Sequence, residues 1–177
     1  MPMADHNAPV QASDLSIRRF QPGDEGTLRE LFFNTIHQVN CRNYSSLQIQ
    51  AWAPQEYDKN QWYQRMCAIQ PYVVLLDKQI VAYADIQPDG YIDHFFCHYQ
   101  YQGQGIGKTL MNTLMAKGAD MGVERFYSHV SITAKPFFTR YGFELVKPQQ
   151  VTIRGQVLNN FVMQKIQRPR PAGNHMP

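Results

Sequence analysis

The spacing of apolar and polar positions changes several times along the chain, and each change predicts a different element. Residues 15–20 (LSIRRF) alternate as a strand does. After Pro22, apolar side chains recur every three or four positions as far as Ile36, which predicts a helix. Two more helical segments are expected at residues 45–54 and 58–69, because each begins with a Ser or Asp that suits a helix N-cap.

The middle of the chain predicts mainly β-structure. Residues 72–99 hold three runs rich in Val, Ile, Phe and Tyr, separated by Asp-Lys and Pro-Asp-Gly turns, which indicates an antiparallel meander. A glycine-rich loop and a helix ending near Gly122 follow, and residues 125–132 predict a strand. A helix that links two strands in this way should make them parallel.

The last third of the domain predicts a short helix at residues 134–142 and a closing hairpin. The hairpin strands are expected at 143–153 and 156–166, with Pro148 at a bulge or an edge. The whole pattern predicts a mixed α/β fold, with a central, mostly antiparallel sheet of about seven strands flanked by helices.

Composition fits one domain with a sizeable core. The 177 residues are 44% hydrophobic, and the domain is expected at residues 14–166 between flexible tails at 1–13 and 167–177. The net charge of +3 comes without a run of Lys or Arg, so no nucleic-acid partner is expected.

Other features of the sequence predict a cytoplasmic protein without a membrane anchor. No apolar stretch approaches the roughly 18 residues of a membrane span, and the N-terminus lacks the apolar segment of a signal peptide. The three cysteines, without CxxC spacing, fit free thiols in a reducing compartment. The sequence does not determine the oligomeric state and is compatible with a homodimer.

The glycine loop is the strongest chemical signal in the chain. Gly103, Gly105 and Gly107 precede a helix and would leave its first backbone N–H groups uncovered, as an anion site requires. Their spacing fits neither GxGxxG nor the Walker A motif. The segment from Gln102 to Gly107 instead resembles the Q/R-x-x-G-x-G/A loop of the GNAT superfamily of N-acetyltransferases. Residues 131–146 (SITAKPFFTRYGFELV) are similar to a later block of that superfamily.

The resemblance implies an acetyl-coenzyme A-dependent N-acetyltransferase that passes the acetyl group directly to an amine in a ternary complex. It implies that the loop binds the coenzyme pyrophosphate, that one strand edge binds the pantetheine arm, and that one aromatic side chain lies beside the thiol. The implied contacts are Gln102, Gly103, Gln104, Gly105, Ile106, Gly107 and Lys108 in the loop, Phe95, Phe96 and Cys97 in the strand, and Phe138.

The residues for proton transfer depart from the superfamily pattern. Phe138 stands where many members have a tyrosine that reprotonates the leaving thiolate, and Tyr141 is expected to point elsewhere and to be a weak substitute. A sensor that binds acyl-coenzyme A without turnover is therefore an alternative. Asp93 and His94 are the candidate bases, and strand alternation predicts that only one of them, by preference Asp93, faces the acceptor.

An aromatic and acidic entrance predicts a cationic amine as the acceptor, with Tyr44, Trp52 and Glu56 as contacts. The alternative is that the tryptophans anchor the helical segments to the sheet. Cys97 could instead carry the acetyl group covalently, if a base lowered its pKa. No metal site is expected, because the histidines lack metal-ligand spacing.

Overall fold

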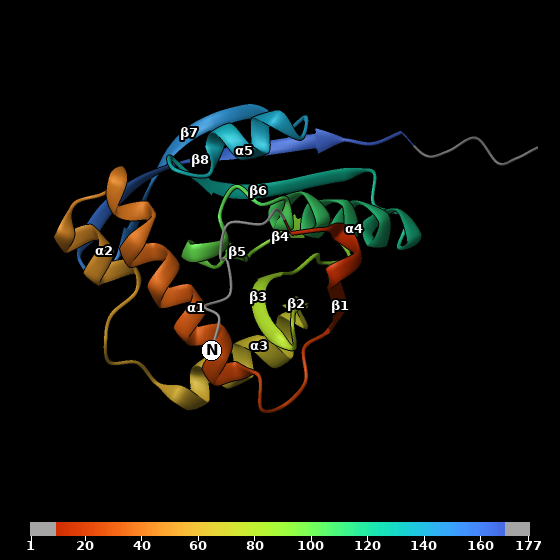
Figure 1. The fold of residues 1–177 in the computed structure, drawn as a ribbon. Helices are drawn as coiled ribbons and strands as arrows, with labels where there is room; N and C mark the ends of the chain where they lie inside the picture. The colour runs from red at the N-terminus through yellow and green to blue at the C-terminus, as the bar shows by residue number, and fades with distance from the viewer. Residues whose placement is uncertain (1–9, 169–177) are drawn as a thin grey trace, which may run out of the picture.

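The structure, a computed structural model, describes residues 10–168, so most of the two expected tails lies outside the described residues (Figure 1). The α-helices are α1 (Glu25–Gln38), α2 (Ser46–Trp52), α3 (Lys59–Ile69), α4 (Ile106–Asp120) and α5 (Lys135–Arg140). The strands are β1 (Leu15–Arg19), β2 (Tyr72–Leu76), β3 (Gln79–Ala84), β4 (Tyr91–Ile92), β5 (Phe95–Cys97), β6 (Arg125–Ser131), β7 (Glu144–Ile153) and β8 (Gln156–Ile166). Short 3-10 helices are η1 (Ala12–Asp14), η2 (Asn40–Arg42) and η3 (Tyr99–Tyr101).

The strands form two sheets of mixed direction. One has the order β1-β2-β3-β5 and the other the order β4-β6-β8-β7. The β4–β6 pair is parallel and the other pairs are antiparallel, so the predicted parallel crossover through α4 is confirmed. Since β5 pairs with β3 and β6 pairs with β4 and β8, the two sheets separate between β5 and β6.

The strand count is eight because the third strand of the meander is divided. The prediction of one continuous strand through Asp93 and His94 is wrong, since these residues lie between β4 and β5. The buried Asp85 carboxylate accepts hydrogen bonds from the backbone N–H groups of Asp93 (3.1 Å) and His94 (2.6 Å). These N–H groups therefore bond to a side chain, which breaks the strand geometry at this point.

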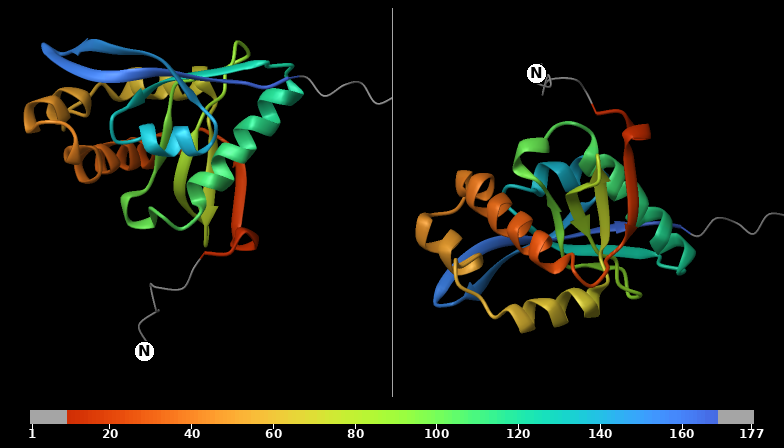
Figure 2. Two further views of the ribbon diagram at one scale, coloured as in Figure 1. Left: turned by 90° about the horizontal axis from the view of Figure 1, so that it is seen from above. Right: turned by 60° about the horizontal axis from the view of Figure 1, so that its bottom comes forward.

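Helices cover both faces of the first sheet, as Figure 2 shows. Val73 and Tyr83, which are partners in the β2–β3 register, pack in a core with residues of α1, α2 and α3. The neighbouring partners Val74 and Ala82 pack in a second core with α4 and α5. Alternation along the strands thus supplies both cores and holds α1 and α4 on opposite sides of one sheet.

Local sequence signals set the helix ends. Ser45 begins α2 with a reciprocal capping box to Gln48, and the Asp58 carboxylate accepts from the N–H of Gln61 (2.9 Å) at the start of α3. Gly122 and Gly142 follow α4 and α5 with φ of +78° and +85°, as the predicted helix stops require.

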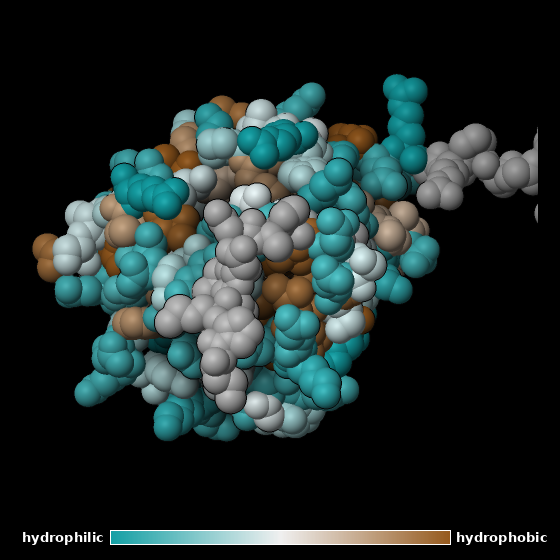
Figure 3. All heavy atoms as spheres, in the orientation of Figure 1, coloured by the Kyte–Doolittle hydropathy of each residue, from teal (hydrophilic) through white to brown (hydrophobic). Residues whose placement is uncertain are grey.

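The predicted C-terminal hairpin is confirmed, with a register shift between Leu145 and Lys147, next to Pro148. Hydrophilic side chains cover most of the face seen in Figure 3. The large exposed apolar side chains are scattered singly or in pairs over α2, the end of α4, β7 and β8. Within residues 10–168, none of the helices has the length and apolar character needed to cross a bilayer.

Candidate active site

A cavity of about 770 Å³ opens where the two sheets separate. Most of the residues expected from the sequence line it: Tyr44, Trp52, Asp93, His94, Phe95, Phe96, Cys97, Gln102, Gly103, Gly105, Gly107, Lys108, Phe138 and Tyr141. Three do not, namely Glu56, Gln104 and Ile106. The Ile106 side chain is fully buried in the core, so only its backbone can reach a ligand at the loop.

The glycine loop leads into the start of α4 with a backbone conformation that favours glycine. Gly103 and Gly105 have φ of +71° and +84°, which side chains other than glycine adopt at a cost. Gly107 has a different reason to be glycine, because a Cβ atom there would lie 3.1 Å from the Phe137 ring of α5. The third glycine therefore allows close packing of α4 against α5.

The first turn of α4 offers its backbone to a ligand. Helix geometry leaves the N–H groups of Ile106, Gly107 and Lys108 without intrahelical partners, and none of them donates to another described residue. The N-cap is Gly105, so no side chain caps this turn. Because the helix dipole adds partial positive charge here, the turn suits a phosphate group.

The polar side chains of the loop differ in whether they already have hydrogen-bond partners within the protein. The Gln102 side chain lines the cavity and uses one of its two Nε2 protons to donate to the Cys97 carbonyl (2.7 Å), which leaves the second for a ligand. Gln104 donates to the Gln100 carbonyl (3.4 Å). The exposed Lys108 lines the cavity and has no hydrogen-bond or ion-pair partner among residues 10–168, so it can add a positive charge beside the helix end.

The edge of β5 that faces away from β3 is open. The His98 N–H donates to the Val81 carbonyl of β3 (2.8 Å), which fixes the direction of the bonding groups at that position. Alternation along an antiparallel strand turns the N–H and C=O groups of Phe95 and the N–H of Cys97 the other way, toward the cavity. An extended ligand can therefore pair with this edge as an added strand would.

Cys97 is held in an environment that does not activate its thiol. Its carbonyl accepts from Gln102 and from the Thr35 hydroxyl (3.1 Å), and its Sγ lies 3.9 Å from the Tyr101 carbonyl. Burial raises the pKa of Cys97 to about 12. A thiol at neutral pH is a poor nucleophile, so the geometry favours direct transfer over a covalent acetyl-cysteine.

Asp93 and His94 both line the cavity, so the prediction that only one of them faces it is wrong. The break between β4 and β5 removes the alternation on which that prediction rested. Asp93 forms an ion pair with Arg65 of α3. The Tyr91 hydroxyl donates to Asp93 at 3.4 Å.

The hydrogen-bond partners of His94 determine which of the two residues can accept a proton. Burial lowers the pKa of His94 to about 4, so its ring is neutral at pH 7. Burial also raises the pKa of Tyr83 well above its ordinary value, so Tyr83 keeps a hydroxyl proton at neutral pH that it can donate to His94 Nδ1, 3.0 Å away. When Tyr83 donates, Nε2 carries the ring proton and faces the Asp93 carboxylate at 3.7 Å, which favours this tautomer. In this tautomer the imidazole has no free lone pair, whereas the carboxylate does.

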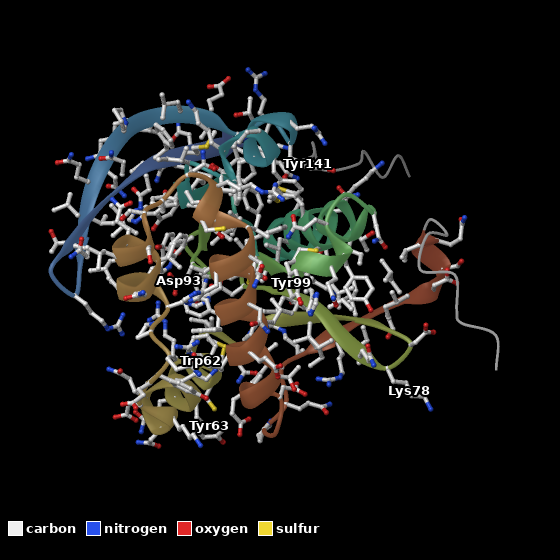
Figure 4. All side chains as sticks on the ribbon, turned by 60° about the vertical axis from the view of Figure 1, so that its left-hand side comes forward. Trp62, Tyr63, Lys78, Asp93, Tyr99 and Tyr141 are labelled. Carbon is white, nitrogen blue, oxygen red and sulfur yellow. The ribbon has the colours of Figure 1, made fainter. Side chains whose placement is uncertain are left out.

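Phe138 and Tyr141 both line the cavity, but only Tyr141 has a hydroxyl that could donate a proton. Phe138 is 3% exposed and packs edge-on against Phe95 and Phe143, with no hydroxyl to offer. Tyr141 packs against Phe137 and lines the cavity, contrary to the expectation that it points elsewhere. Its hydroxyl makes no hydrogen bond to the described residues. Figure 4 shows Tyr141 well apart from Asp93.

The aromatic residues at the other end of the cavity make hydrogen bonds and ring contacts within the fold. The Tyr44 hydroxyl donates to the Asn159 carbonyl (2.6 Å) and accepts from the Ile132 N–H (3.0 Å), so it joins the α2 region to the second sheet. Trp52 packs edge-on against Tyr44. Trp62 donates to the Glu25 carbonyl (2.8 Å) and holds α3 to α1, whereas the anchoring alternative placed such a contact at the sheet.

The expectation of an acidic entrance is not supported by the geometry. Glu56 is exposed outside the cavity wall, and Asp93 is paired with a cation. Three arginines that the sequence reading did not single out line the same end, namely Arg29, Arg65 and Arg154. Asp85 was also missed, although a lone carboxylate in the apolar run IVAYADI is a signal for a buried partner.

Two more polar atoms in the cavity wall are available to a ligand. Thr133 Oγ1 and Asn160 Oδ1 are buried and have no hydrogen-bond partner among the described residues. The described part of the chain holds no group of three His, Cys, Asp or Glu side chains that could bind a metal ion.

A splayed sheet, an uncapped helix end after a glycine loop and a strand edge open to the gap are the features of an N-acetyltransferase of the GNAT type. The acetyltransferase (GNAT) domain matches residues 40–164, and the chain belongs to this family. It is 34% identical over 151 residues to YafP, an uncharacterised N-acetyltransferase of Escherichia coli (strain K12), with 85% of this chain and 95% of YafP covered.

Solved structures have the same fold. A GCN5-related N-acetyltransferase from Rhodopseudomonas palustris superposes with a TM-score of 0.82 at 27% identity, over 86% of this chain and 95% of that one. The PaiA N-acetyltransferase from Thermoplasma acidophilum, solved in complex with coenzyme A, gives a TM-score of 0.71 at 18% identity, over 86% and 99% of the two chains. The predicted mixed α/β, GNAT-type fold is thereby confirmed.

Proposed function

We propose that this N-acetyltransferase moves the acetyl group of acetyl-coenzyme A directly to an amine, with both substrates bound in the cavity at once. The observation that carries this proposal is that the α4 anion site and the open β5 edge face one cavity. Coenzyme A in the PaiA structure supports the same ligand class. The amine nitrogen forms a bond to the thioester carbonyl carbon, the carbon–sulfur bond breaks, and the sulfur leaves as a thiolate.

Each part of the cavity has a role in this transfer. The N–H groups of Ile106, Gly107 and Lys108 bind the pyrophosphate, and the free edge of β5 pairs with the pantetheine arm. A free N–H on this edge can polarise the thioester carbonyl. The Asp93 carboxylate accepts the amine proton, while His94 is held neutral between Tyr83 and Asp93 and positions that carboxylate.

A sensor that binds acyl-coenzyme A without turnover is the second candidate, and the phenylalanine at position 138 favours it. The deciding experiment is coenzyme thiol release from acetyl-coenzyme A with a panel of amines, followed by mass analysis of the products. We expect amine-dependent release and intersecting initial-velocity lines, as a ternary complex gives. Tight binding without release on any amine would support the sensor.

Cys97→Ala should keep kcat within about threefold, because the raised pKa leaves the thiol inactive. Loss of turnover in this variant would support a covalent acetyl-cysteine.

Tyr141 is the donor that the structure offers to the leaving thiolate. Tyr141→Phe should lower kcat by about tenfold with the affinity for acetyl-coenzyme A unchanged. The loss is limited because a thiol with a pKa near about 8.5 leaves readily as the thiolate near neutral pH. Single-turnover rates measure this effect, with Tyr127→Phe as the control, since that hydroxyl bonds to Asp89 on the surface. Unchanged turnover in Tyr141→Phe would mean that the thiolate leaves without this hydroxyl.

We also propose a cytoplasmic location. Cys41, Cys67 and Cys97 form no disulfide within the described residues, which supports a reducing compartment.

A further inference from the structure

Arg29 of α1 is a buried cation at the end of the cavity away from the glycine loop. Arg29 is only 5% exposed, although it lines the cavity. Its guanidinium carbon lies 4.2 Å from the ring centre of Tyr57, 5.3 Å from that of Phe32 and 5.7 Å from that of Trp62. These rings come from α1, from α3 and from the loop between α2 and α3, so the cation sits in an aromatic pocket.

The charge of Arg29 has no carboxylate partner within residues 10–168. Its Nη2 donates to the Pro54 carbonyl (2.6 Å), and the guanidinium makes no other hydrogen bond or ion pair there. Burial lowers the pKa of Arg29, but an arginine stays protonated at physiological pH. Aromatic faces and one carbonyl offset only part of the cost of burying a cation, which is otherwise high unless an anion pairs with it.

The two carboxylates at this end of the cavity are engaged elsewhere. Asp93 is paired with Arg65, and Asp58 caps the first turn of α3 through the Gln61 N–H. A third arginine, Arg154, also lines this end and donates to the Ala51 carbonyl (2.7 Å). The acceptor end therefore has an excess of positive charge, whereas a site for a simple cationic amine would need the opposite sign.

Arg29 lies close enough to the proposed base to hold one end of a small acceptor. The Phe32 ring, 5.3 Å from the guanidinium, lies 5.8 Å from the His94 ring and 5.0 Å from the Phe96 ring of β5. Through Phe32, the Arg29 guanidinium carbon lies at most about 11 Å from the centre of the His94 ring, a separation that an amino acid bound between them can bridge. A guanidinium presents N–H groups in a fork that matches the two oxygens of a carboxylate.

We propose that Arg29 binds an oxyanion of the acceptor, so that the acceptors of this enzyme are amines that also carry an acid group, first of all a carboxylate. This proposal rests on the proposed acetyl transfer and names its substrate class. The acid group binds at Arg29, and the amine of the same molecule points toward Asp93 and the β5 edge. Selection of such acceptors follows because an acceptor without the anion leaves a buried cation unpaired.

The first arm of the test compares matched acceptors on the parent enzyme. Amino acids are set against their primary amides, their decarboxylated amines and their phosphonate analogues in the thiol-release assay. We expect kcat/KM to be at least about tenfold higher for the acids than for the amides and decarboxylated amines. Activity with the phosphonates would widen the class from carboxylates to oxyanions in general. Equal or better activity with the decarboxylated amines would overturn the proposal and leave acetyl transfer intact.

The second arm removes the cation. Arg29→Gln should lower kcat/KM for acid-bearing acceptors about thirtyfold and leave it nearly unchanged for decarboxylated amines, whereas Arg29→Lys should keep part of the preference. Arg19→Gln is the matched control, since Arg19 also lies over a tyrosine ring, at 4.2 Å from Tyr72, and also donates to one backbone carbonyl (2.8 Å), but on the exposed surface. An equal loss for both acceptor types in Arg29→Gln would mean that Arg29 only supports the fold.

The third arm measures binding without turnover. Calorimetry of N-acetylated amino acids on the enzyme with coenzyme A should show binding in the parent and at least tenfold weaker binding in Arg29→Gln. If no amine releases thiol but this binding depends on Arg29, the proposed anion site is supported and the proposed acetyl transfer is refuted. If thiol is released but neither the acceptor preference nor this binding depends on Arg29, the proposed anion site is refuted and the proposed acetyl transfer is kept. Should Arg29→Gln not fold, the parent's preference and the Arg29→Lys variant decide.

Discussion

Gly105→Glu is expected to weaken the binding of acetyl-coenzyme A by at least about 100-fold, or about 2.7 kcal/mol. Gly105 is the N-cap of α4, and the uncapped N–H groups that follow it are the proposed pyrophosphate site. A glutamate there places a negative charge and a side chain beside the groups that would bind the phosphates. Lys108 remains as the positive charge at this end, which prevents complete loss. Calorimetry with acetyl-coenzyme A measures the effect.

Gly122→Glu is the matched control for this variant. Gly122 has φ of +78°, close to the +84° of Gly105, and a Cβ atom at either position would meet nothing within 4 Å. Both substitutions therefore impose the same left-handed strain, of order 1–2 kcal/mol, at opposite ends of one helix. Equal coenzyme affinity in the parent and in a folded Gly105→Glu would show that the pyrophosphate lies elsewhere. Weakening in both variants would point to strain in α4 instead.

The fold and the coenzyme end of the cavity were predictable because local sequence determines both. Gly103 and Gly105 are required by their own backbone angles, and the uncapped turn after them follows from helix geometry alone. Gly142 ends α5 for the same kind of reason. Such features depend on residues within one or two turns, so a single sequence carries them.

The acceptor end was poorly predicted because distant residues shape it. Asp85 breaks the strand at Asp93 and His94 by accepting their N–H groups, and strand periodicity contains no trace of this contact. Arg29 looks like an ordinary polar residue of α1, and contacts with Pro54, Tyr57 and Trp62, all distant in the sequence, help to bury it. The sequence places the acids Glu56 and Asp58 close to Trp52 and Trp62, whereas the fold leaves Glu56 outside the cavity and uses Asp58 to cap α3.

The Asp93 substitution tests the chemistry where the sequence reading and the geometry differ most. Asp93→Asn should lower kcat/KM by at least about 100-fold with coenzyme affinity unchanged, because the amide cannot accept the amine proton. His94→Gln should cost less than about tenfold, since His94 is proposed only to position the carboxylate. Asp89→Asn is the matched control, since Asp89 lies in the turn before β4 and bonds to Tyr127 outside the cavity.

The pH dependence separates the two candidate bases. The pKa of His94 is lowered to about 4 by burial, so His94 loses its proton well below neutral pH and stays neutral from there upward. An acidic limb of kcat/KM between pH 5 and 8 therefore cannot come from His94 and should persist in His94→Gln. If Asp93→Asn keeps both the limb and the rate while His94→Gln loses them, His94 is the base and Tyr83 must accept from Nδ1 instead of donating to it. If neither variant changes the profile, the amine loses its proton to water, and the Asp93–Arg65 ion pair serves to fix α3 against the break between β4 and β5.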